Sequence, residues 1–166
     1  MTTQKHPYKV EVVWTGNHGT GTSGYRTYGR EHEVRADTAP VILGSADPAF
    51  RGDPTRWNPE QLQVAALSQC HMLWYLHFAA EAGVNVVAYA DHAEGVMVED
   101  QAGAGQFESV TLHPRVTITA DSDPATATAL HAKVPGVCFI ARSVNFPVRH
   151  DPRILIHPET PTPSRP

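Results

Sequence analysis

The feature that most constrains this chain is a long apolar stretch, residues 58–83, which carries the signals of a single helix. Asn58 can cap its N-terminus, Pro59 suits the first helical position, and Gly83 suits the left-handed position after the last turn. Apolar side chains occupy most of its circumference: Leu62, Val64, Ala65, Ala66, Leu67, Cys70, Met72, Leu73, Trp74, Leu76 and Phe78. A helix that is apolar nearly all round must be enclosed, so we predict a central helix.

This helix is not expected to span a membrane. Polar residues interrupt the run of about 20 apolar residues that a bilayer requires, and they include Glu60, Gln63, His71 and His77. The amino terminus also lacks the apolar region of a signal peptide, so we expect a cytoplasmic protein. In that reducing compartment the two cysteines are less suited to a structural disulfide than to an inert, metal-binding or redox-active role.

The charge balance excludes one class of partner. The chain has 13 basic and 17 acidic residues, which gives a formal net charge of -4. It contains no basic stripe, so we expect no nucleic-acid surface. Gly19, Gly21 and Gly24 form part of a glycine-rich stretch, but no helix pattern follows them, which argues against a phosphate-binding loop.

The remaining pattern predicts an α+β fold. Three strands are expected before the central helix and a long antiparallel hairpin after it, followed by a short helix capped by Asp123 and a final strand. The expected strands are residues 8–14, 25–35, 38–43, 84–98, 107–120 and 153–157, and the short helix is 125–133. We predict one domain over residues 1–157 and a disordered proline-rich tail over 158–166.

The small sheets of one chain can cover only part of a helix that is apolar all round. A second copy of the chain is the simplest way to bury the rest. We therefore predict an obligate homodimer.

The two cysteines are the main candidates for chemistry. Cys70 alone could be a small buried hydrophobic residue. Cys138, however, directly follows the helix-terminating Pro135 and Gly136, in a segment placed to pack against the central helix. Two such thiols suit a nucleophile and a resolving partner. A zinc site is disfavoured because the cysteines lack paired short spacings, and His71 and His77 lack i, i+4 spacing.

The NPEQL sequence at residues 58–62, followed by Cys70 and by Cys138 after a short helix, resembles the OsmC/Ohr family of thiol peroxidases. This resemblance implies an OsmC-like domain in an intertwined homodimer with two long helices at its centre. It implies a peroxidatic Cys70, a resolving Cys138, and Glu60 as the residue that orients an arginine beside the thiolate.

The identity of that arginine stays open. Arg51, in the loop before the NPE sequence, matches one branch of the family with an offset of one position, and we favour it. Arg26, in the expected first hairpin, is the candidate from the other branch. On one straight helix Glu60 and Cys70 lie about 15 Å apart along the axis, so either the helix bends or Glu60 acts across the dimer.

The expected activity is the reduction of organic hydroperoxides to alcohols. Cys70 would form a sulfenic acid, Cys138 would convert it to a disulfide, and an external dithiol of the dihydrolipoyl type would reduce that disulfide. No metal or organic cofactor is expected, and Met72, Trp74 and Phe78 are candidates to line an apolar pocket. The alternative is a protein of the same fold that binds a lipophilic molecule or senses oxidation without turnover.

Overall fold

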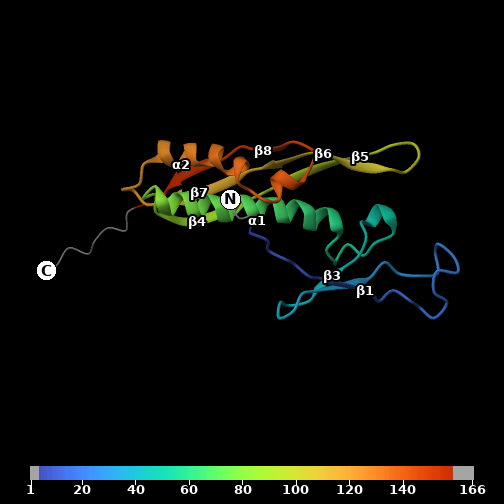
Figure 1. Ribbon diagram of the computed structural model, residues 1–166. Helices are drawn as coiled ribbons and strands as arrows, with labels where there is room; N and C mark the ends of the chain where they lie inside the picture. The colour runs from blue at the N-terminus through green and yellow to red at the C-terminus, as the bar shows by residue number, and fades with distance from the viewer. Residues whose placement is uncertain (1–3, 159–166) are drawn as a thin grey trace. The chain divides into compact units, whose positions relative to one another are not determined.

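A computed structural model describes residues 4–158, which fall in two compact units, Met1–Gln63 and Val64–Pro166 (Figure 1). Both contain strands, and the longest helix, α1, spans Pro59–Glu81. The predicted α+β class is confirmed. The predicted tail lies outside the described residues except for Pro158.

The first unit contains a three-stranded antiparallel sheet in the order β1-β2-β3. Its strands are β1 (Glu11–Trp14), β2 (His32–Arg35) and β3 (Ile42–Gly44), and a 3₁₀ helix, η1 (Pro48–Phe50), follows. All three strands are shorter than predicted.

Local turn formation before β2 accounts for the shortening of the second strand. Asn17 Oδ1 accepts hydrogen bonds from the amides of Gly19 and Gly21, and the Thr27 amide donates to Gly24. The prediction of a half-buried first strand is also wrong for the single chain, since Val12 is 63% exposed. Alternating apolar residues predict a covering layer, but a layer from another chain would produce the same alternation.

The two ends of α1 follow the predicted signals. Asn58 Oδ1 accepts a hydrogen bond from the Gln61 amide at 2.8 Å, and Gln61 Oε1 accepts one from the Asn58 amide at 3.2 Å. This reciprocal pair satisfies two amides that the helix itself cannot pair. At the other end Gly83 has φ +72°, the left-handed conformation that glycine adopts without a Cβ clash.

The second unit contains two three-stranded sheets, ordered β4-β7-β9 and β5-β6-β8. Their strands are β4 (Val86–Asp91), β5 (Glu94–Glu99), β6 (Gly105–Leu112), β7 (Pro114–Ile118), β8 (Val148–His150) and β9 (Arg153–Ile156). The antiparallel pairs β4–β7 and β5–β6 correspond to the predicted hairpin. The parallel pairs β6–β8 and β7–β9 were not predicted, nor was β8 itself.

The predicted single hairpin forms two separate strand pairs, because residues 92–93 separate β4 from β5 and residue 113 separates β6 from β7. Asp91, at the end of β4, is the residue that organises this break. Its Oδ1 accepts a hydrogen bond from the His113 amide at 2.7 Å, and its Oδ2 accepts one from the Ser68 hydroxyl at 2.5 Å. Asp91 therefore also links this break in the strands to α1.

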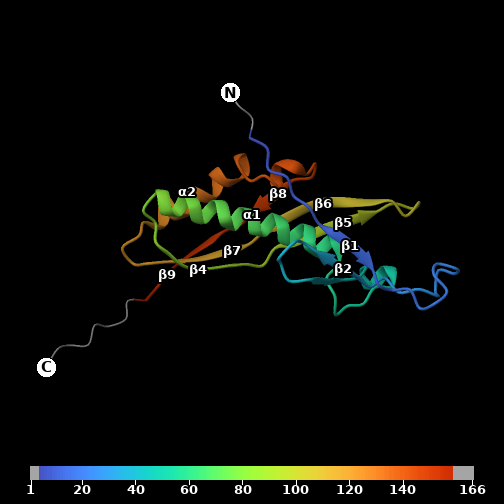
Figure 2. The same cartoon turned by 60° about the horizontal axis from the view of Figure 1, so that its bottom comes forward.

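The second helix, α2 (Pro124–Leu130), is capped by Asp123 as predicted, with the Thr126 amide donating to Asp123 Oδ2 at 2.8 Å. It continues as a 3₁₀ helix, η2 (His131–Gly136), and a short 3₁₀ turn, η3 (Ala141–Ser143), follows. Figures 1 and 2 both show α2 beside the C-terminal half of α1.

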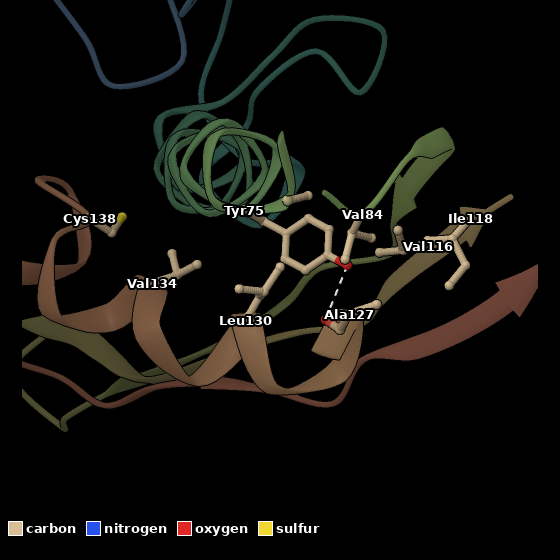
Figure 3. Close-up of a cluster of buried hydrophobic side chains, with 9 residues drawn as sticks. Tyr75, Val84, Val116, Ile118, Ala127, Leu130, Val134 and Cys138 are labelled. Atoms are coloured by element: carbon tan, nitrogen blue, oxygen red, sulfur yellow. Dashed lines mark hydrogen bonds between the residues drawn. The ribbon is translucent and has the colours of Figure 1, made fainter. Parts of the chain in front are cut away.

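The main core of the second unit lies between α1, α2 and the β4-β7-β9 sheet (Figure 3). Tyr75 on α1 is fully buried, and its hydroxyl donates a hydrogen bond to the Ala127 carbonyl at 3.1 Å. The other buried members of this cluster are Ala79, Val84, Val116, Ile118, Ala127, Leu130, Val134 and Cys138. Burial of these apolar side chains stabilises the packing of the α2–η2 segment against α1.

Within residues 4–158, no helix combines the length and apolar character that crossing a membrane requires.

Candidate functional site

The two cysteines meet in the second unit. Cys70 is half-buried in the middle of α1, and Cys138 is buried just after η2. Their Sγ atoms are 2.6 Å apart, and both are free thiols. A disulfide bond is about 2.05 Å long, so bond formation requires little movement of either side chain.

Local structure explains how a residue so distant in sequence reaches Cys70. The α2–η2 segment is fixed on α1 by the buried side chains of Leu130 and Val134 and by the Tyr75–Ala127 hydrogen bond (Figure 3). The Cys138 amide then donates to the Val134 carbonyl at 2.9 Å, which ends η2 with the thiol facing the helix. The contact between the sulfurs is therefore part of a packed core rather than of a loose loop.

The surroundings of Cys138 oppose its ionisation. Burial raises the pKa of the Cys138 thiol to about 11, and its hydrogen bond to Cys70 adds to this effect. The Ala141 amide, which donates to Cys138 Sγ at 3.4 Å, acts in the opposite direction. Cys138 is consequently a neutral thiol at physiological pH.

Aromatic side chains flank the two thiols. Trp74 lies one turn after Cys70. Its ring packs edge-on against Phe139, with 5.8 Å between centroids, and at a tilt against Phe78, with 5.7 Å between centroids. Phe139 follows Cys138 and is 63% exposed. Trp74 and Phe78 thus lie in the aromatic cluster, Trp74–Phe78–Phe139, whereas Met72 is not part of it.

The predicted arginine and glutamate belong to the first unit. Arg51 is exposed, ends η1 and has φ 68°, a left-handed conformation that is unfavourable for a residue with a side chain. Glu60 lies in the first turn of α1, and its Oε2 is buried without a hydrogen-bond partner among the described residues. Arg26 is exposed in the turns before β2, and neither arginine joins an ion pair among residues 4–158.

A cluster of three histidines was not predicted from the sequence. His71 Nε2 and His131 Nδ1 are 2.9 Å apart, and the His150 ring lies 5.5 Å from the His71 ring and 6.2 Å from that of His131. Burial lowers the pKa of His71 to about 4 and that of His131 to about 3, and the neighbouring histidines contribute further. The available signal was the unusual number of histidines, ten in 166 residues.

No group of three or more His, Cys, Asp or Glu side chains suited to holding a metal ion occurs within the described part of the chain.

Comparison with known proteins identifies the family. The profile of the OsmC-like protein family matches residues 52–152, more than half of the chain. The chain therefore belongs to the OsmC-like family. No curated protein gave a sequence match.

Solved structures agree with this assignment. An OsmC-like protein of unknown function from Vibrio cholerae is 30% identical, with a TM-score of 0.80, and the match covers 90% of this chain and 100% of that one. An organic hydroperoxide resistance protein from Elizabethkingia anophelis is 17% identical, with a TM-score of 0.64 and coverages of 93% and 100%. The organic hydroperoxide resistance protein OhrB of Bacillus subtilis is 19% identical, with a TM-score of 0.63 and coverages of 89% and 98%.

Proposed function

We propose that this protein is a thiol peroxidase that reduces organic hydroperoxides to alcohols. The observation that carries the proposal is the 2.6 Å separation of two free sulfurs, Cys70 and Cys138, in the core of the second unit. Fold relatives named as organic hydroperoxide resistance proteins support the choice of substrate class.

The proposed catalytic cycle has three steps. The Cys70 thiolate attacks one oxygen of the hydroperoxide, the O–O bond breaks, and the alcohol leaves with a proton while Cys70 becomes a sulfenic acid. The Cys138 thiol then condenses with this sulfenic acid to give a disulfide and water. An external dithiol, for which we favour the dihydrolipoyl type, reduces the disulfide by exchange and is itself oxidised.

The different environments of the two thiols support their different roles. Cys70 is partly accessible, as an attacking nucleophile must be, whereas Cys138 is only 1% exposed and its pKa is raised to about 11. The thiolate, not the thiol, is the nucleophile. Cys138 is therefore suited to the second step, in which its partner is already in contact.

The aromatic cluster Trp74–Phe78–Phe139 supports an organic substrate. Apolar surface next to the thiols favours a hydroperoxide with an apolar substituent over hydrogen peroxide, because burial of the substituent contributes binding energy. The exposure of Phe139 leaves part of this surface accessible to a ligand.

Two experiments separate this proposal from the alternative, a protein that binds a lipophilic molecule or senses oxidation without turnover. The first is consumption of cumene hydroperoxide in the presence of dihydrolipoamide. Many equivalents per chain support the peroxidase. The second is titration with a non-reactive analogue, cumyl alcohol: tight binding without consumption of hydroperoxide favours the binding protein.

We propose that Arg51, oriented by Glu60, is the cation that stabilises the Cys70 thiolate and donates to the peroxide. The orphaned Glu60 Oε2 supports this, since a buried carboxylate oxygen requires a donor and an arginine is a suitable one.

Replacing Arg51 by alanine is expected to slow oxidation of Cys70 by about 100-fold or more, since one preorganised charged donor contributes on that scale. Stopped-flow loss of the Cys70 thiol after mixing with cumene hydroperoxide measures this step. Arg26→Ala is the matched control and is expected to leave the rate unchanged. A normal rate in Arg51→Ala with a slow rate in Arg26→Ala would transfer the role to Arg26.

We also propose that the protein is an obligate homodimer. In α1 the buried residues form one stripe at i, i+4 spacing, Leu67, His71, Tyr75 and Ala79, while Leu73 is 62% exposed. Apolar residues of the first sheet are also exposed, including Val12 and Leu43. A second copy would bury such surfaces, and across such a dimer Glu60 could act on the opposite chain.

Sedimentation equilibrium at micromolar concentration is expected to give twice the chain mass of 18.1 kDa. Burial of an exposed apolar helix face contributes enough free energy to keep an obligate interface closed at that concentration. A stable folded monomer would contradict the proposal.

A further inference from the structure

The histidine cluster His71–His131–His150 joins three elements of the second unit: α1, the start of η2, and β8. His71 and His131 are 4% and 1% exposed, and a hydrogen bond of 2.9 Å joins them. Tyr75 stacks on His131 with ring centroids 4.0 Å apart. The rings are thus held rigidly, at the same level of α1 as Cys70.

Packing alone is a poor explanation for this cluster. Burial of polar imidazoles is unfavourable unless each nitrogen is paired, and His131 Nε2 is buried with no hydrogen-bond partner among the described residues. Apolar side chains of similar volume would stabilise the same position better. A group of this kind is often retained for chemistry.

A small cavity connects the cluster to the resolving thiol. It has a volume of about 10 Å³, and its lining includes Cys138, His71 and His150. Its remaining lining is mostly apolar: Leu67, Leu112, Pro135, Ala141, Val148 and Arg149, the last an exposed residue. A cavity of this size holds about one water molecule, which would have the thiol and two imidazoles as polar partners.

A base at this place would assist the proposed second step. Cys138 is buried and neutral, and it must lose its proton as the S–S bond forms. His71 has Nε2 committed to His131 Nδ1. When the shared proton resides on His71 Nε2, His71 Nδ1 is left as a free acceptor.

We propose that His71 is the general base for the Cys138 thiol, acting through one water in the shared cavity, and that His131 is a positioning residue that holds the His71 ring and its tautomer. The inference rests on the proposed function. The thiol proton passes to His71, the Cys138 sulfur attacks Cys70 Sγ, and the S–O bond of the sulfenic acid breaks. The departing hydroxide takes the proton back as water, so no external oxidant, reductant or net proton is needed.

The test separates oxidation of Cys70 from formation of the disulfide. One equivalent of cumene hydroperoxide is mixed with wild type, His71→Gln, His131→Gln and the exposed control His92→Gln. Quenched samples are analysed by mass spectrometry for dimedone-trapped sulfenic acid and for disulfide. Cys70 should be oxidised at the wild-type rate in all four proteins, whereas disulfide formation should slow by about 100-fold in His71→Gln. His131→Gln should slow the same step less, and His92→Gln should not change it.

Disulfide formation at the wild-type rate in folded His71→Gln, with sulfenic acid formed normally, overturns the role of His71 and leaves the peroxidase proposal intact. Failure of wild-type Cys70 to react at all overturns both. If His71→Gln does not fold, the wild type is measured in D₂O. A slower disulfide step with an unchanged oxidation step supports the base, and equal disulfide rates in the two solvents overturn it.

Discussion

Cys70→Ser is expected to lose hydroperoxide consumption completely, down to the rate of the dithiol alone, a fall of several orders of magnitude. A serine hydroxyl is not ionised at physiological pH, and the proposed first step depends on a thiolate. The measurement is loss of cumene hydroperoxide with dihydrolipoamide in excess.

Cys138→Ser is the matched control, because it removes the other sulfur of the 2.6 Å pair and leaves α1 unchanged. Mixed with cumene hydroperoxide in the absence of dithiol, it should still consume one equivalent per chain in a single burst, and then stop at the sulfenic acid because no resolving thiol follows. Full turnover in Cys70→Ser would contradict the proposed cycle. A burst in neither variant would indicate that the sulfurs act only as a pair, as in a redox sensor.

The ends of α1 were predictable because their causes are local: Asn58, Gln61 and Gly83 satisfy the helix termini with side chains or backbone within a few residues. The position of Cys138 directly after Pro135 and Gly136 suggested that it could meet the central helix. The contact itself joins residues 68 positions apart and depends on the packing of α2 and η2 on α1.

The parallel pairing of β8 with β6, and of β9 with β7, could not be anticipated in this way. Each pair joins segments about 40 residues apart, and no turn sequence specifies the partner of such a strand. The three-residue β8 also has too short a pattern to be recognised. Yet β8 carries His150, so missing this strand also meant missing one of the three histidines.

The histidine cluster shows the same limit. Each histidine is unremarkable in its own segment, and His71 and His131 are separated by 60 residues. Only the packing of α2 and η2 on α1 turns them into a buried hydrogen-bonded pair. Periodicity identifies which face of a helix is buried, but it does not identify which residue of another element meets it.

Acidification is expected to destabilise the fold between about pH 6.5 and pH 4. The pKa of His71 falls to about 4 and that of His131 to about 3 in the folded chain, against a usual value of 6.5, chiefly because burial disfavours the charged imidazole. The nearby His150 contributes in the same direction, while Asp91 partly opposes it at His71.

The sign of the effect follows from proton binding. Below pH 6.5 the unfolded chain takes up protons on these histidines and the folded chain does not, so the free energy of unfolding falls as pH falls. The stability is fully present at pH 7 and above, and the loss by pH 4 is on the order of 3 kcal/mol for each histidine. Asp53 and Asp123, whose pKa values are lowered by hydrogen bonds to Thr55 and Thr126, lose their contribution only at lower pH.

Urea unfolding followed by tryptophan fluorescence, at fixed protein concentration from pH 7.5 to 4, measures this dependence. In His71→Gln and His131→Gln the slope of unfolding free energy against pH should be shallower than in wild type, and it should be shallowest in the double variant. The His92→Gln control should keep the wild-type slope, because His92 is exposed and lies outside the buried histidine cluster. An unchanged slope in the double variant would mean that other groups carry the acid sensitivity. In His71→Gln, a flatter slope of unfolding free energy against pH, together with slower disulfide formation, would link two properties of the same side chain. Burial of the neutral imidazole would then both destabilise the fold in acid and place a base near Cys138.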